Sequence, residues 1–165
     1  MNLIPYTLPK PSQHERTFTS LFKLKQALKQ QMQPLNSYAL GLAQDELPVI
    51  ARIQNAPALL VAGENIRSCE NLLATISNTI NVPARLSAIL VSRYADNWHG
   101  LNPTVQPVKP ERLGTVLQHH MQSNSHRLVM MLDNLGTGWD IELQSLSMLI
   151  HAPQFHLIVT PSPNN

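Results

Sequence analysis

The hydrophobic positions of the chain include four short runs that are almost continuously apolar. They are residues 58–63 (ALLVAG), 86–92 (LSAILVS), 127–132 (RLVMML) and 155–160 (FHLIVT). Runs of this kind are typical of strands that are buried on both faces, as in a parallel sheet. The segment from Leu47 to Ile53 (LPVIARI) alternates instead, and it predicts a half-buried strand.

Between these runs the apolar residues recur at helical spacing. The pattern predicts helices over Cys69 to Ile80, Glu111 to Gln122 and Trp139 to His151, and an earlier amphipathic helix from Thr17 to Gln33. Alternating strands and helices indicate an α/β fold with a mainly parallel sheet of about four to five strands and helices on both faces. We expect residues 93–110 to form an irregular surface connection.

The first part of the chain differs in composition from the rest. Prolines at positions 5, 9 and 11 predict an extended arm. We therefore divide the chain of 165 residues into an arm with a basic amphipathic helix (1–35) and one domain (36–165). Residues 1–35 carry a net charge of +4 and the remainder −2. The basic residues are a candidate DNA-contacting set or a solvated helix face: Lys10, Arg16, Lys23, Lys25 and Lys29.

Other features restrict the class of protein. No apolar run has the length of a membrane span, and the start of the chain lacks the apolar core of a signal peptide. The single cysteine, Cys69, forms no internal disulfide bond. No pair of histidines has the spacing of a zinc site on a helix. We expect a cytoplasmic protein with no membrane partner and no metal site.

The segment from Gly63 to Glu70 (GENIRSCE) has the layout of a phosphate-binding loop between a strand and a helix. Such a loop needs the pattern G-x-x-x-x-G-K-[ST], in which lysine binds phosphate and the hydroxyl binds Mg²⁺. Gly63 fits the first position, and Glu64, Asn65, Ile66 and Arg67 follow it. Ser68 then replaces the second glycine, Cys69 the lysine and Glu70 the hydroxyl residue.

These replacements predict weak nucleotide binding or none. A carboxylate at position 70 repels a polyanion, although Arg67 partly compensates. The alternative is purely structural, with Gly63 turning the chain and Glu70 meeting the positive end of the helix dipole. Cys69 at the helix start is also a candidate for a reactive thiol, which the neighbouring Glu70 opposes.

The run 127–135 (RLVMMLDNL) resembles the acidic strand that accompanies a phosphate loop. Asp133 stands where a carboxylate would complete the Mg²⁺ shell, and Asn134 stands where a glutamate would activate water. Because an amide cannot act as a base, hydrolysis loses its catalyst. Asp133 then has either a residual metal role or the role of a strand-end cap.

The order of these segments resembles the motor domain of FtsK-type DNA translocases. The run YALGLAQDELPVIARIQNAPALLVAGENIRSCENLLATI, followed by RLVMMLDNL and FHLIVTPSP, matches the motor pattern from about Tyr38 to Pro163. The most specific part is Leu40 to Gly63. The resemblance implies a three-layer RecA-like P-loop fold, a hexameric ring and ATP-driven movement along duplex DNA, with relatives that drive protein secretion. Pro161 or Ser162 replaces the sensor glutamine of the family.

Because the loop and the acidic strand both depart from the family pattern, we expect no catalytic residues and no bound ATP or Mg²⁺. The first hypothesis is a non-catalytic interaction or scaffold subunit with a protein partner, either a motor subunit or a further copy of the chain. The alternatives are an ATPase with an unusual phosphate loop and a DNA-binding module that acts through the basic helix.

The resemblance also raises the question of what covers the phosphate-loop strand. In the RecA-like order a fifth strand lies beside it, and the chain ends before that strand. We expect Leu47 to Ile53 to fold back on Ala58 to Ala62 as a hairpin across the turn QNAP. The alternative is a strand from a neighbouring subunit or partner.

Overall fold

The computed structural model describes residues 21–54, 58–62, 65–83, 87–98, 100–122, 127–135 and 155–161. Its main element is a five-stranded parallel sheet with the order β3-β7-β6-β4-β5. The strands are β3 (Ala58–Leu60), β4 (Ser87–Val91), β5 (Val105–Val108), β6 (Leu128–Leu135) and β7 (Phe155–Pro161). The predicted α/β class with a mainly parallel sheet is confirmed.

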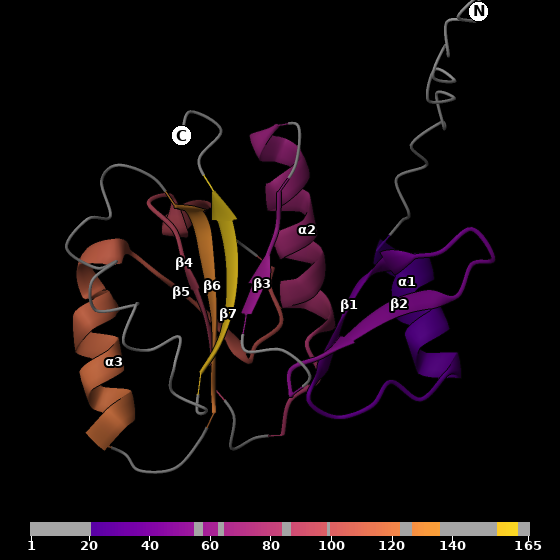
Figure 1. Ribbon diagram of the computed structural model, residues 1–165, viewed down its shortest axis with the longest axis horizontal. Helices are drawn as coiled ribbons and strands as arrows, with labels where there is room; N and C mark the ends of the chain where they lie inside the picture. The colour runs from indigo at the N-terminus through magenta and orange to yellow at the C-terminus, as the bar shows by residue number, and fades with distance from the viewer. Residues whose placement is uncertain are drawn as a thin grey trace, which may run out of the picture.

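Helices cover both faces of this sheet, as Figure 1 shows. The helix α2 (Ile66–Thr79) lies on one face and α3 (Leu113–Gln122) on the other. Two short 3-10 turns, η1 (Ala95–Asn97) and η2 (Pro110–Arg112), flank β5. Pro110 begins η2, directly before α3, where its fixed φ suits the start of a helix. The predicted helix from Trp139 to His151 lies outside the described residues.

The continuous apolar runs form strands because both faces of the sheet are buried. Along β6, Val129 and Met131 pack in the core with α2, whereas Leu128, Met130 and Leu132 pack in the core with α3. Successive side chains of a strand point to opposite faces, so two covered faces require an apolar residue at every position.

A smaller unit precedes the main sheet. It consists of α1 (Leu21–Gln30) and the antiparallel pair β1 (Ser37–Leu42) and β2 (Pro48–Arg52). Leu24 and Leu28 of α1 pack against Ala39, while the other face of the pair contributes Tyr38 to the core shared with α2. The pair therefore lies between α1 and the α2 face of the sheet (Figure 1).

Hydrogen bonds fix this unit to the rest of the domain. The hydroxyl of Tyr38 lies 3.1 Å from Nε2 of His156 on β7, and both residues are almost completely buried. The backbone N–H of Ala39 donates to Oγ1 of Thr79 at 3.0 Å. The end of α2 and the strand β7 are thereby joined to β1.

Three expectations about the strands need correction. The predicted hairpin between Leu47–Ile53 and Ala58–Ala62 is wrong, because β2 pairs with β1 in a separate sheet. Residues 93–110 are not wholly irregular, since they contain β5, which extends the sheet beside β4. The strand β1 was not predicted either; its burial comes from α1, which precedes it, and from α2, which lies far from it in the sequence.

Candidate functional site: a degenerate phosphate loop at the carboxyl edge of the sheet

The loop before α2 and the end of β6 lie at the same edge of the sheet. Leu60 and Leu132 are both paired in register with Val159, which lies between them on β7. The residues that follow them, Val61 and Asp133, are therefore at one level on the carboxyl edge. This is the edge at which open α/β sheets bind ligands. Gly63 and Glu64 lie outside them.

The start of α2 is capped by the chain itself. Asn65 is the N-cap residue with extended backbone dihedrals, and its Oδ1 accepts hydrogen bonds from the backbone N–H of Ser68 at 2.9 Å and from Oγ of Ser68 at 3.1 Å. In a phosphate loop such N–H groups bind the phosphate oxygens. Here the side chain of Asn65 already satisfies one of them.

The positions that should carry the lysine and the hydroxyl are also unsuited to phosphate. Cys69 is buried with 7% exposure, and its Sγ lies 3.9 Å from the carbonyl oxygen of Val61. Its neighbour Glu70 is partly exposed. Arg67 and Ile66 are exposed in the first turn of α2, so Arg67 is the one basic side chain that the described residues of this loop offer.

Asp133 is buried with 3% exposure, and other protein groups bind its carboxylate. Oγ of Ser92, at the end of the neighbouring strand β4, donates to Oδ2 of Asp133 at 2.8 Å. Burial raises the pKa of Asp133, and the side-chain hydrogen bonds from Ser92 and Trp98 lower this pKa by less. The carboxylate thus lacks the open, solvated position of a metal ligand.

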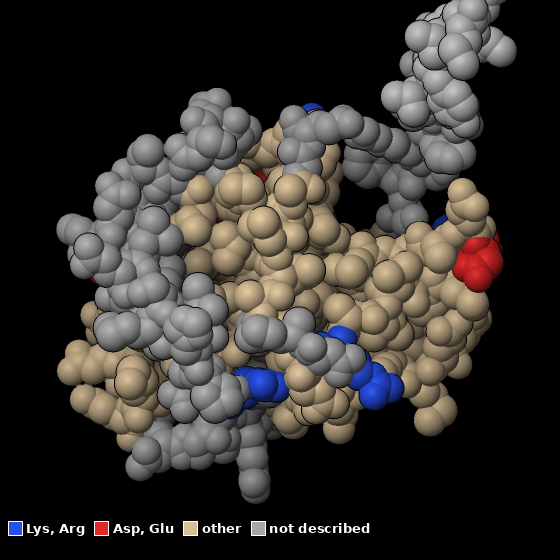
Figure 2. Space-filling model, in the orientation of Figure 1, with Lys and Arg blue, Asp and Glu red and all other residues tan. Residues whose placement is uncertain are grey.

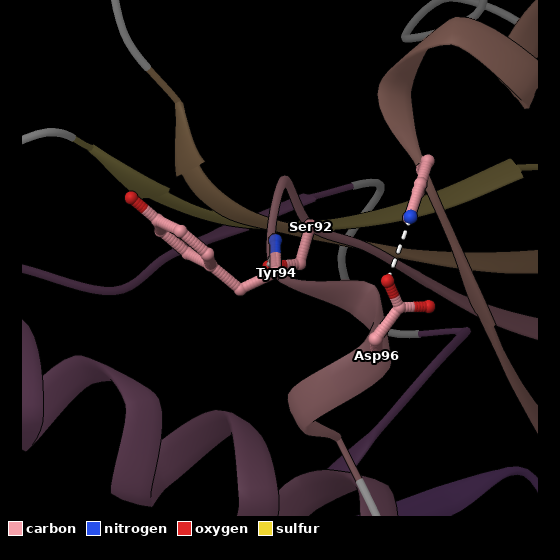
Figure 3. Close-up of polar contacts among 4 residues, drawn as sticks. Ser92, Tyr94 and Asp96 are labelled. Carbon is pink, nitrogen blue, oxygen red and sulfur yellow. Dashed lines mark hydrogen bonds and ion pairs between the residues drawn. The ribbon is translucent and has the colours of Figure 1, made fainter.

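The turn after β4 is built around Ser92. Its Oγ accepts from the backbone N–H of Tyr94 at 3.1 Å, and the ring of Tyr94 extends away from Ser92 and Asp96 (Figure 3). Asp96 forms an ion pair of 2.6 Å with Nζ of Lys109 (dashed line in Figure 3). Because both of these side chains are substantially exposed, this pair contributes little stability. The bond from Ser92 to Asp133 connects this turn to β6.

Asn134, at the position of the missing catalytic glutamate, has a left-handed backbone with φ of 55°. Its N–H donates to Oγ1 of Thr160 at 2.7 Å, and the β6–β7 register shifts between Leu132 and Leu135. Oδ1 of Asn134 is buried and accepts no hydrogen bond from the described residues. The site therefore has an amide in a strand irregularity where a motor would have a base.

The remaining candidates lie elsewhere. Lys23, Lys25 and Lys29 are exposed on α1, away from this edge, while Lys10 and Arg16 lie outside the described residues. Within the described part of the chain no three His, Cys, Asp or Glu side chains are grouped as a metal site requires. In the same part no helix has both the length and the apolar character needed to span a membrane.

Sequence reasoning missed Ser92 and the pair formed by Tyr38 and His156. A signal for Ser92 was present, because it is the polar residue that ends an apolar run, as Asp133 is. Parallel neighbours place such residues side by side, and β4 pairs with β6 up to Val91 and Leu132. Tyr38 and His156 are separated by 118 positions, and nothing in the sequence connects them.

Comparison with known proteins gives structural matches alone. No protein-family model matches the sequence, and no curated protein matches it. Among solved structures, the cytoplasmic domain of EssC superposes with a TM-score of 0.57 at 15% identity, over 96% of this chain and 37% of that chain. EccC of Thermomonospora curvata (ATPases 2 and 3), in complex with a signal sequence peptide, gives 0.56 at 17% identity, over 79% of this chain and 30% of that one.

This chain thus spans about a third of the length of the proteins that it resembles. At these identities the likeness establishes the fold alone, which is an α/β RecA-like fold shared with ATPase domains.

Proposed function

We propose that this chain is a non-catalytic domain derived from an FtsK-type motor, which acts as an interaction subunit for a polypeptide partner. The single observation that carries the proposal is the position of Cys69. Where a motor ATPase has the lysine that binds the β- and γ-phosphates, this chain has a thiol that is buried beside the carbonyl oxygen of Val61.

The rest of the edge supports the same proposal. Asn65 caps the helix start that would otherwise bind an anion. The hydroxyl of Ser92 donates a hydrogen bond to the carboxylate of Asp133. A nucleotide would have to displace both interactions and would then meet no lysine. Its phosphates would also lie near Glu70, whose charge repels them.

A solved structure of similar fold supports a polypeptide as the class of partner. The EccC structure is in complex with a signal sequence peptide. A subunit of an active motor or a second copy of this chain is a polypeptide partner of the same class.

Calorimetric titration with Mg-ATP tests the proposal. We expect no binding tighter than about millimolar, which corresponds to roughly 4 kcal/mol, and no turnover above background. Micromolar affinity or measurable hydrolysis would contradict the non-catalytic assignment and favour an ATPase with an unusual loop.

A restoration variant tests the same point from the other side. Ser68→Gly, Cys69→Lys and Glu70→Ser together restore the motif residues, and we expect them to increase affinity for inorganic triphosphate. The matched control carries Ser68→Gly and Glu70→Ser with Cys69 retained. Equal phosphate binding by both variants would show that position 69 is not the reason for the missing affinity.

A further inference from the structure

A groove lies between α1 and the carboxyl-terminal end of α2, far from the degenerate phosphate loop at the other end of that helix. Its lining includes two lysines (Lys25 and Lys29), four amide residues (Gln33, Asn78, Asn81 and Asn102) and three apolar residues, of which Met32 is one. No carboxylate contributes to it among the described residues. The groove is therefore cationic, and amides make up half of its uncharged lining.

The floor of the groove is held in place by its own amides. Nε2 of Gln33 donates to the carbonyl oxygen of Thr79 at 2.7 Å, and Nδ2 of Asn81 donates to the carbonyl oxygen of Gln33 at 3.0 Å. These bonds fix the end of α1 against the end of α2. A ligand would find a surface that is already ordered, which lowers the entropy cost of binding.

The two lysines are the charged groups that remain available. Lys25 and Lys29 are four residues apart on α1 and so lie on one face of the helix. Both are exposed, and neither forms an ion pair with the described residues. Lys23 differs, because it lines a separate groove together with Asp45 and Glu46.

Met32 offers an apolar side chain beside these charges. Its backbone conformation lowers the stability of the folded chain. Its φ is 51°, in the left-handed region that disfavours side chains other than those of Gly, Asn and Asp, and its exposed fraction is 85%. The backbone N–H of Gln33 donates to the carbonyl oxygen of Leu28 at 3.2 Å, as in the capping motif that usually has glycine at the position of Met32. The strained backbone and the exposed side chain of Met32 favour a binding role for this residue.

We propose that this groove docks an acidic polypeptide segment, whose carboxylates meet Lys25 and Lys29 and whose apolar side chain packs on Met32. The inference rests on the proposed function, since it names the surface by which an interaction subunit would hold its partner. Charge complementarity and the ordered concave shape carry the argument.

Other anionic partners fit the groove less well. Two lysines release about two counterions, whereas duplex-DNA binders commonly make roughly 6–10 phosphate contacts. The face shown in Figure 2 carries separate small groups of basic side chains on its described residues, not a broad basic surface. A membrane is flat and would not enter a groove.

Fluorescence anisotropy with a short labelled peptide of glutamate and leucine tests the inference. We expect saturable binding to the full chain, and no binding of a lysine–leucine peptide. The double variant Lys25→Glu, Lys29→Glu should weaken binding by about tenfold or more, since each exposed charge pair contributes up to roughly fivefold in affinity and the reversed charges repel the peptide. Lys23→Glu, on the same helix, is the matched control and should leave binding unchanged.

Met32→Gly separates binding from folding. Glycine tolerates the left-handed backbone, so this variant should be at least as stable as the parent while it binds the peptide more weakly. A loss of affinity accompanied by a loss of stability would overturn the role of Met32.

Three results would overturn the inference as a whole. They are no saturable binding of the acidic peptide, equal weakening by Lys23→Glu, and tighter binding to duplex DNA or to anionic vesicles than to the peptide. The Mg-ATP titration is independent of all three, so this inference can fail while the non-catalytic assignment stands.

Discussion

The hydroxyl of Ser92 donates a hydrogen bond of 2.8 Å to the carboxylate of Asp133, across two adjacent strands and within the buried part of the sheet. The residue that matches a metal-binding aspartate of motor ATPases is thus held by the protein itself. This bond joins the ends of β4 and β6 at the carboxyl edge of the sheet.

Ser92→Ala should lower the free energy of unfolding by about 1.5–3 kcal/mol at neutral pH, because it removes one of the side-chain donors to a buried charged acceptor. Ser77→Ala is a suitable control, since Ser77 is equally buried but, among the described residues, its hydroxyl donates to the sulfur of Met131 at 3.3 Å and not to a charged group. Urea denaturation measures both variants. A larger loss for Ser77→Ala would contradict the importance of the bond to Asp133.

Asp133→Asn should become more stable relative to the parent as the pH rises. Burial raises the pKa of Asp133 above its ordinary value of 3.8, so the folded state holds the proton more tightly than the unfolded state does. The parent therefore loses stability as the pH rises from about 3.8 through the folded pKa, whereas the amide does not titrate. Denaturation curves from pH 4 upward measure this difference, and a difference that stays constant with pH would exclude the effect.

Asn65→Ala should destabilise α2 by about 1 kcal/mol, because it removes the side-chain acceptor of the Ser68 N–H. Asn65→Asp keeps an acceptor at the cap and adds a negative charge near the positive end of the helix dipole. We expect the aspartate variant to retain the stability of the parent in urea titrations. Equal losses in the two variants would mean that a side-chain acceptor at position 65 is not what stabilises the helix.

Tyr38→Phe should lower stability by about 1–3 kcal/mol at neutral pH, because it removes the hydroxyl partner of the buried His156. Desolvation by burial raises the pKa of Tyr38 from 10.0 to about 12. Stability linked to this phenol is complete below pH 10 and is lost as the pH rises towards 12. The difference in free energy of unfolding between the parent and Tyr38→Phe should therefore shrink above pH 10. Thermal unfolding at several pH values measures this difference.

Amide exchange should distinguish the two edges of β3. The N–H of Val61 donates to the carbonyl oxygen of Val159 at 2.8 Å, so the N–H of Leu60, one residue earlier, points to the opposite edge. No described strand pairs with that edge, and Leu60 is 68% exposed. In dilute monomer we expect Val61 to be protected and Leu60 to exchange rapidly. Protection of Leu60 that appears on association would identify this edge as a strand-pairing site.

The α/β class and the buried central strands could be predicted from the sequence. Their runs are apolar at every position because two covered faces demand it, and that requirement is visible locally in 127–132 and 155–160. The replacements at Ser68, Cys69, Glu70 and Asn134 are equally local. Each differs from the residue that the phosphate-loop or acidic-strand pattern has at that position, whatever surrounds it.

Only the tertiary structure decided which segments pair and which polar groups meet. The strand β2 ends only a few residues before β3 in the sequence, yet it pairs with β1, because that pairing places Ala39 against α1 and Tyr38 against α2. The strand β5 contains Pro107 and a polar residue, and it becomes a strand through its edge position beside β4. The bond from Ser92 to Asp133 joins residues 41 positions apart. Such contacts depend on register and layer order, which arise when distant elements pack together and leave no trace in the periodicity of either segment.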